Sequence, residues 1–152
     1  GLPTGKAPLS EGFAVFREFL QIKPDLHVAG QVRNGTTKGI DENALAAYNA
    51  PFPDDDHKQG VRQFPNLVPG TPRTPSAEPN KEAWKILREW KKPFLCAFSD
   101  KDPIFSGVEN SFYKLIPGCK DMPHVTIEDA GHFLQEDQPE ACVDAILSIK
   151  DI

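Results

Sequence analysis

The sequence lacks long apolar runs, basic clusters and all but three cysteines, and each of these absences excludes a class of protein. No apolar stretch approaches the roughly 20 residues that a membrane-spanning helix needs, and no charged-then-apolar leader marks the chain for export. The net charge of −5, from 22 acidic and 17 basic residues, argues against nucleic acid or an anionic membrane as a partner. The cysteines have no zinc-binding spacing, so we expect free thiols in a reducing cytoplasm and no metal site.

Proline, in contrast, is abundant. The chain has 15 prolines, where the average usage of about 5% would give roughly half that number. The composition changes near residue 80, from short amphipathic stretches joined by proline-rich turns to a more regular pattern. We therefore divide the chain into a segment 1–80 and a segment 81–152.

The first segment is predicted to be mostly helical. Apolar residues at steps of three and four predict a helix over 10–21, with Ser10 as its N-cap. Further helices are expected over 41–49 and 56–61. The proline-rich stretch 65–79 is expected to be a loop.

The second segment alternates helices and strands. Helices are predicted over 81–91, 107–115 and 138–150, and strands over 94–98 and 124–128. A strand–helix–strand crossover makes the two strands parallel, which indicates an α/β fold. Two strands cannot cover both faces of the apolar run 94–98, and sheets of this class have about five or six strands. We therefore expect the sequence to be the last part of a longer protein.

Each predicted strand is followed by a polar residue suited to catalysis. Asp102 follows the first strand and His132 follows the second, 30 residues later. Because ligands gather at the carboxyl ends of parallel strands, we expect the two side chains to meet at one edge of the sheet. A carboxylate that orients an imidazole forms two-thirds of a nucleophilic triad. Taken singly, an Asp-Pro turn and a Gly-His loop are also common in proteins where they have no catalytic role.

A triad also needs a nucleophile, and the sequence has no recognisable one. Neither Gly-x-Ser-x-Gly nor Gly-x-Asp-x-Gly occurs, although the sharp strand-to-helix turn of these enzymes is typically built on such a motif. In that chain order the nucleophile precedes the acid, so it would lie before Gly1. This is a second indication that the parent protein is longer.

The segments that carry the candidate pair resemble the last two strands of α/β-hydrolases. Phe94-Leu-Cys-Ala-Phe-Ser-Asp-Lys-Asp-Pro-Ile and Ala130-Gly-His-Phe-Leu-Gln-Glu-Asp are most similar to haloalkane dehalogenases whose catalytic acid follows the seventh strand. Ala47-Tyr-Asn-Ala-Pro-Phe-Pro-Asp and Gly60-Val-Arg-Gln-Phe-Pro resemble the cap domain of that group. The resemblance implies the carboxyl-terminal half of an α/β-hydrolase fold. A mostly helical cap over 1–80 is then followed by two parallel strands with flanking helices over 81–152.

This resemblance also implies a reaction, the hydrolysis of carbon–halogen bonds without metal or organic cofactor. An aspartate in the missing amino-terminal half would attack the carbon, and His132, oriented by Asp102, would activate the water that hydrolyses the alkyl-enzyme ester. The partners implied are a small apolar halogenated substrate, the halide ion and that missing half. The residues implied to line the substrate pocket are Phe13, Phe16, Phe52 and Pro53. Without the nucleophile, the chain alone is expected to be inactive.

One position departs from the family pattern, and three alternatives stay open. Phe16 stands where the similar dehalogenases carry a cap tryptophan that donates its ring N–H to the halide, and phenylalanine has no donor. An epoxide hydrolase of the same fold needs cap tyrosines, of which segment 1–80 has only Tyr48. A serine esterase would differ in a nucleophile outside the sequence. A non-catalytic lid or half-subunit is the third alternative.

Overall fold

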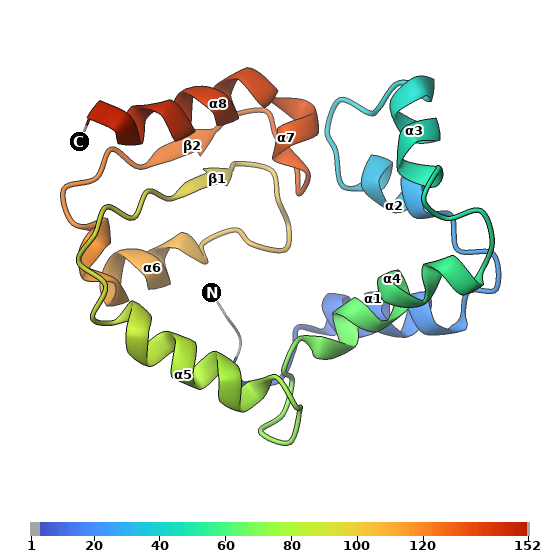
Figure 1. Cartoon of the computed structure of the whole chain (residues 1–152), viewed down its shortest axis with the longest axis horizontal. Coiled ribbons are helices and arrows are strands. Elements are labelled where there is room, and N and C mark those ends of the chain that lie inside the picture. The colour runs from blue at the N-terminus through green and yellow to red at the C-terminus, as the bar shows by residue number, and fades with distance from the viewer. Residues whose placement is uncertain (1–3, 152) are drawn as a thin grey trace. The chain divides into compact units, whose positions relative to one another are not determined.

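The computed structural model describes residues 4–151, which form short helices and one small sheet (Figure 1). These residues divide into two compact units. The first unit comprises residues 4–31 and 42–85, and the second comprises residues 32–41 and 86–151. A boundary between cap and core at residue 80 stays a prediction. None of the helices within residues 4–151 combines the length and apolar character needed to cross a membrane.

The first unit is helical. Its elements are α1 (Glu11–Ile22), the start of α2 (Val28–Asn34), α3 (Glu42–Asn49), 3₁₀ turns at Asp56–Lys58 and Phe64–Leu67, α4 (Gln59–Gln63) and most of α5 (Ala77–Leu87). The Ser10 hydroxyl accepts a hydrogen bond from the backbone N–H of Phe13 at 3.3 Å, so the predicted N-cap is confirmed. The helices predicted over 41–49 and 56–61 are also confirmed, to within a few residues at their ends.

A buried arginine ties the helices of the first unit together. Arg62 is 8% exposed, and its guanidinium donates to the backbone carbonyls of Leu20 and Pro24. The same guanidinium lies 2.7 Å from the carboxylate of Asp55. The side-chain amide of Gln21 in turn donates to the Arg62 carbonyl. Because a buried charge is tolerated only when it is paired and hydrogen-bonded, these contacts fix the end of α1 against α4.

The second unit is built on a two-stranded parallel sheet (Figure 1). Its elements are β1 (Ala97–Ser99), α6 (Glu109–Leu115), a 3₁₀ turn at Pro117–Cys119, β2 (Val125–Ile127), α7 (Leu134–Asp137), α8 (Pro139–Leu147) and a 3₁₀ turn at Ser148–Asp151. In the register of the sheet, Ala97 lies opposite Val125 and Ser99 opposite Ile127. The predicted α/β class, with two parallel strands and flanking helices, is confirmed.

Apolar side chains from the strands and helices form the core of this second unit. Ile127 and Ile116 are 1% and 2% exposed, and α8 packs against β2. The Phe112 ring of α6 has its centroid 5.8 Å from that of Phe94 and 6.1 Å from that of Phe98. The sheet therefore has apolar packing partners from both flanking helices.

The strand β1 is shorter than the predicted strand 94–98. The backbone N–H of Phe94 donates to the carbonyl of Gly118, and that of Cys96 donates to Nδ1 of His124 at 3.1 Å. The Nε2 atom of His124 lies 3.0 Å from the Cys119 carbonyl. The N–H groups of Phe94 and Cys96 therefore bind a loop and a side chain, whereas the Cys96 carbonyl accepts a hydrogen bond from the N–H of Val125 in β2. His124, directly before β2, thus has a structural role.

Three helices differ from the prediction, and the shortest of them, α7, has no predicted counterpart. The helix expected over 81–91 is α5, which begins at Ala77 inside the predicted loop. Ala77 is fully buried, and proline is tolerated in a first helical turn, where Pro79 lies. The helix α2 has no predicted counterpart, because Gly30 weakens its helical propensity. Burial of Val28 and Ala29 stabilises it instead.

Candidate active site

Asp102 and His132 lie side by side beyond the ends of the two strands. Because β1 ends at Ser99 directly opposite Ile127, the last residue of β2, the loops that follow leave the sheet at the same edge. The Nδ1 atom of His132 lies 3.0 Å from Oδ2 of Asp102. The structure thus brings together the two side chains that the sequence pattern singled out.

Both oxygens of the Asp102 carboxylate have hydrogen-bond partners. The residue is 6% exposed, its Oδ1 accepts a hydrogen bond from the backbone N–H of Ile104 at 2.8 Å, and its Oδ2 faces the ring of His132. Hydrogen-bond partners of this kind offset the cost of burying a carboxyl group. An acceptor at Nδ1 favours the tautomer with its proton on that atom, which leaves the Nε2 lone pair free to take a proton.

Two phenylalanine rings hold the imidazole of His132. The Phe105 ring stacks on it at a centroid distance of 5.4 Å, and the Phe133 ring meets it edge-on at 5.1 Å. The His132 side chain is still 29% exposed. The ring is therefore restricted in orientation but remains accessible, as a general base must be.

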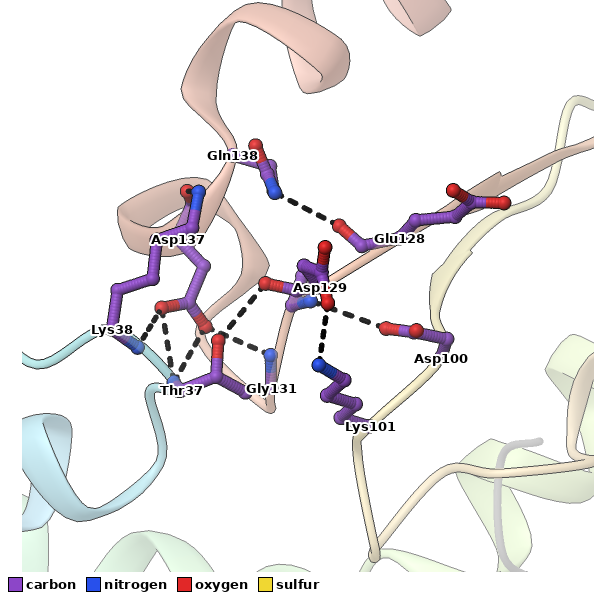
Figure 2. A network of polar contacts seen from close by, with 10 residues as sticks. Thr37, Lys38, Asp100, Lys101, Glu128, Asp129, Gly131, Asp137 and Gln138 are labelled. Carbon is purple, nitrogen blue, oxygen red and sulfur yellow. Dashed lines mark hydrogen bonds and ion pairs between the residues drawn. The ribbon is translucent and has the colours of Figure 1, made fainter.

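The loops that carry Asp102 and His132 are linked by hydrogen bonds and an ion pair (Figure 2). The backbone N–H of Lys101 donates to the carbonyl of Ala130, and the Ala130 N–H donates to Oδ1 of Asp100. The ammonium group of Lys101 pairs with the carboxylate of Asp129. Asp129 has a positive φ of 55°, a region that aspartate adopts more readily than most residues. This sharp turn directly after β2 redirects the chain toward His132.

The predicted pocket residues belong to the first unit. Phe13 and Phe16 lie on α1 with their ring centroids 6.4 Å apart, and Phe16 is 37% exposed. Phe52 is half-buried and Pro53 is exposed, in the turn after α3. That these four residues line a substrate pocket stays a prediction.

The cysteines are poor nucleophiles. Burial raises the pKa of the Cys96 thiol to about 12, and the neighbouring Cys119 adds to this effect. Burial also raises the pKa of Cys119 and of the half-buried Cys142. Because the thiolate is the reactive form, we do not assign a catalytic role to any of the three.

This burial predicts a clear order of thiol reactivity. At pH 8, a pKa of about 12 leaves roughly one thiol in ten thousand of Cys96 as thiolate. We expect Cys142 to react with Ellman's reagent first and Cys96 and Cys119 to react only upon unfolding. The measurement is the amount of thionitrobenzoate released over time, one equivalent for each cysteine of the folded chain that reacts. The chain unfolded in guanidinium is the control in which all three thiols react. Rapid release of two or more equivalents from the folded chain would contradict this burial.

Sequence reasoning missed a segment that contacts the His132 loop. The backbone N–H of Phe133 donates to the carbonyl of Gly35 at 3.1 Å, and Thr37 and Lys38 bind the buried carboxylate of Asp137. Thr37 and Asp137 are 100 residues apart, and their contact uses a backbone N–H that any residue except proline can supply. The closing Asp of the Gly-His-Phe-Leu-Gln-Glu-Asp run was the only available signal.

The Asp137 carboxyl is held in its ionised form. Burial alone would raise its pKa, but hydrogen bonds from the backbone N–H groups of Gly131, Lys38 and Thr37 outweigh this effect and lower the pKa below the ordinary aspartate value. The ammonium of Lys38 donates to the Asp137 carbonyl, and that of Lys101, which pairs with Asp129, interacts with the Asp137 carboxylate through its charge alone.

These contacts predict that the second unit loses stability in acid. A lowered folded-state pKa contributes stability that is fully present above the ordinary aspartate pKa of roughly 3.9 and is lost as the pH falls through the folded value. Asp137→Asn should therefore lower the urea midpoint at pH 7, and the difference from the unchanged chain should shrink as the pH falls below about 4. Urea titrations across this range measure it. A difference that stays constant with pH would contradict the prediction.

Among residues 4–151, no group of three or more His, Cys, Asp or Glu side chains is arranged to hold a metal ion. The Asp102–His132 pair itself provides a base with an orienting carboxylate. Such a pair can take a proton from water or from a hydroxyl group.

The curated proteins that are similar in sequence to this chain carry the same name. No family model matches the sequence. The chain is 49% identical over 139 residues to a haloalkane dehalogenase of Psychrobacter cryohalolentis, a match that covers 91% of this chain and 46% of that protein. It is 38% identical over 147 residues to a haloalkane dehalogenase of Mycolicibacterium paratuberculosis, covering 97% and 48%. The chain thus spans about half the length of the curated relatives it matches.

A solved structure extends the comparison to the fold. The chain is similar to the haloalkane dehalogenase DpaA from Paraglaciecola agarilytica, with a TM-score of 0.85 and 28% sequence identity. The match covers 99% of this chain and 50% of that protein.

Proposed function

Because the chain belongs to the haloalkane dehalogenase family, with the fold of the carboxyl-terminal half of an α/β-hydrolase, we propose that it supplies the hydrolytic half of a haloalkane dehalogenase active site. The observation that carries this proposal is the 3.0 Å contact between Asp102 and His132 at the strand ends. In this proposal His132 is the general base and Asp102 the acid that orients it. The reaction takes place in the cytoplasm and uses no metal or organic cofactor.

The reaction has two steps. An aspartate carboxylate from the amino-terminal half attacks the halogen-bearing carbon, a C–O bond forms, the carbon–halogen bond breaks and the halide leaves. Water then gives a proton to Nε2 of His132 while its oxygen attacks the carboxyl carbon of the ester. The bond from the carboxyl carbon to the alkoxy oxygen breaks, Nε2 of His132 returns its proton to that oxygen, and the alcohol leaves. The carboxyl group of the nucleophile keeps the other hydrogen of the water and releases it as a proton, which restores the carboxylate. The sum of these steps is an alcohol, a halide ion and a proton.

The surroundings of His132 suit the second step. Asp102 holds the ring proton on Nδ1 and stabilises the imidazolium that forms when Nε2 is protonated. The contacts with Phe105 and Phe133 restrict rotation of the ring, so its orientation is set before water is activated. A small halogenated substrate and its halide bind among Phe13, Phe16, Phe52 and Pro53, and exclusion of water there strengthens the interactions with the leaving halide.

A chimera tests this proposal. The chain would replace the 139 matching residues of the Psychrobacter cryohalolentis dehalogenase, which provides the amino-terminal half. We expect the folded chimera to release halide from 1,2-dibromoethane at a steady rate and the 152-residue chain alone to release none. A folded chimera that releases no halide, or that hydrolyses epoxides or esters instead, would contradict the proposal.

The position of Phe16 predicts a gain of activity. A hydrogen bond to an ion contributes roughly 1.5–3 kcal/mol, so a tryptophan N–H at this position should raise the rate of halide release about ten- to 150-fold if the bond forms only in the transition state. The measurement compares Phe16→Trp with Phe19→Trp, a matched exchange on the same helix, in the chimera. Equal effects of the two exchanges would contradict the assignment of Phe16 to the halide site.

A further inference from the structure

Asp137 is a buried carboxylate with a dense set of backbone donors (Figure 2). It is 3% exposed. The backbone N–H of Gly131 donates to Oδ2 at 2.8 Å, that of Lys38 donates to Oδ1 at 2.9 Å, and that of Thr37 lies within 3.0 Å of both oxygens. Each donor is a main-chain group, so the carboxylate fixes the path of the backbone at three points.

Two of these points belong to residues 35–38, which we call the strap. The strap makes further contacts with the His132 loop. The Thr37 hydroxyl donates to the carbonyl of Asp129 at 2.9 Å, and the Lys38 ammonium donates to the carbonyl of Asp137 at 2.8 Å. The carbonyl of Gly35 accepts from the backbone N–H of Phe133.

The strap and Asp137 together hold the backbone on both sides of His132. Gly131, the residue before it, donates to Asp137, and Phe133, the residue after it, donates to Gly35. The backbones also approach closely, because a Cβ added to Gly131 would lie 2.5 Å from the Gly35 carbonyl oxygen. A displacement of the strap would therefore move the peptide groups on both sides of His132, and with them its imidazole ring.

We propose that Asp137 is a positioning residue, whose carboxylate holds the strap and the Gly131 peptide so that the His132 ring stays on Asp102. Its role differs from that of Asp102, since it acts through the backbone of the His132 loop. Asparagine cannot replace it, because one of the two carboxylate acceptors becomes an NH₂ donor that faces N–H groups. The consequence for catalysis rests on the function proposed above, whereas the consequence for the ring does not.

The tautomers of two histidines test the positioning role in the 152-residue chain itself. At about pH 8.5, where an ordinary imidazole is neutral, the ring ¹⁵N shifts report which nitrogen carries the proton. His132 should carry it on Nδ1, facing Asp102, and His124 on Nε2, facing the Cys119 carbonyl. His124 is therefore an internal reference for the fold of the same unit. His132→Gln and His124→Gln variants assign the signals.

The expected result is a change confined to His132. A hydrogen bond to a charged acceptor gives a tautomer preference of about tenfold or more. In Asp137→Asn we expect the tautomer preference of His132 to fall below about threefold, whereas the tautomer preference of His124 should stay unchanged. Gly131→Ala, which pushes the strap away, should have the same effect. Asp144→Asn, a matched exchange at an exposed position of α8, should change neither histidine.

Any other pattern would overturn the proposal. A preserved Nδ1 preference of His132 in Asp137→Asn and Gly131→Ala would show that the ring does not depend on the strap. Parallel changes in His124 would show that the exchange alters the folded structure throughout the unit and that Asp137 does not position His132 in particular.

The chimera provides the catalytic readout. A catalytic group displaced by about 1 Å can slow a reaction on the order of a hundredfold. We therefore expect Asp137→Asn to slow turnover by about that factor, whereas the first halide per active site should be released at an unchanged rate. An equal loss in both steps would overturn the positioning role. If the unchanged chimera released no halide, the proposed function would fail, and the histidine tautomers would still decide the role of Asp137.

Discussion

Replacing His132 with alanine in the chimera is expected to stop turnover while one halide is still released per active site. The first step needs only the aspartate nucleophile, whereas hydrolysis of the ester needs a base to activate water. General bases typically contribute 10²–10⁴-fold, so steady halide release should fall by at least about a hundredfold. Rapid-quench measurement of halide over the first turnover and over later turnovers separates the two steps.

A second histidine provides the control for this exchange. His57 lies in an exposed turn of the first unit and pairs with Asp54. His57→Ala should leave both the first and the later turnovers unchanged. Steady turnover in His132→Ala close to that of the unchanged chimera would contradict the assignment of His132 as the base.

Replacing Asp102 with asparagine is expected to reduce turnover by about 10⁴-fold, the loss known for the corresponding exchange in a serine-protease triad. The side-chain carbonyl of asparagine can still accept from the Ile104 N–H, so the turn is kept. Its NH₂ group then faces Nδ1 of His132 and favours the proton on Nε2, the atom that must accept a proton from water.

The size and the step of this loss are both informative. Asp102→Asn should keep the first release of halide and slow only the hydrolysis of the ester, as His132→Ala does. Asp144→Asn, at an exposed position of α8, is the matched control and should leave turnover unchanged. A loss smaller than about tenfold in Asp102→Asn would contradict the orienting role, since that role predicts a far larger effect.

The sequence predicted those features that depend on local pattern. Ser10 before an apolar repeat predicted the N-cap of α1, and the strand–helix–strand order predicted a parallel pair of strands. Because the ends of parallel strands are aligned, it also predicted that Asp102 and His132 would meet, although they are 30 residues apart. Their catalytic roles remain a proposal that rests on the family and on their geometry.

Features that depend on distant partners could not be predicted from the sequence. The start of β1 is set by the His124 side chain, which takes the N–H of Cys96 away from any ladder. The strap binds Asp137 through backbone N–H groups, and these leave no trace in residue type. The helix α2 forms because Val28 and Ala29 are buried, although its own sequence favours a helix only weakly.

Intact-mass spectrometry of the His132→Ala chimera after reaction with 1-bromobutane tests most directly whether the Asp102–His132 pair hydrolyses an alkyl-enzyme ester. We expect the variant to retain the mass of one butyl group and the unchanged chimera to retain none at the end of the reaction. A His132→Ala chimera that releases bromide continuously and carries no butyl group would contradict the role of the pair.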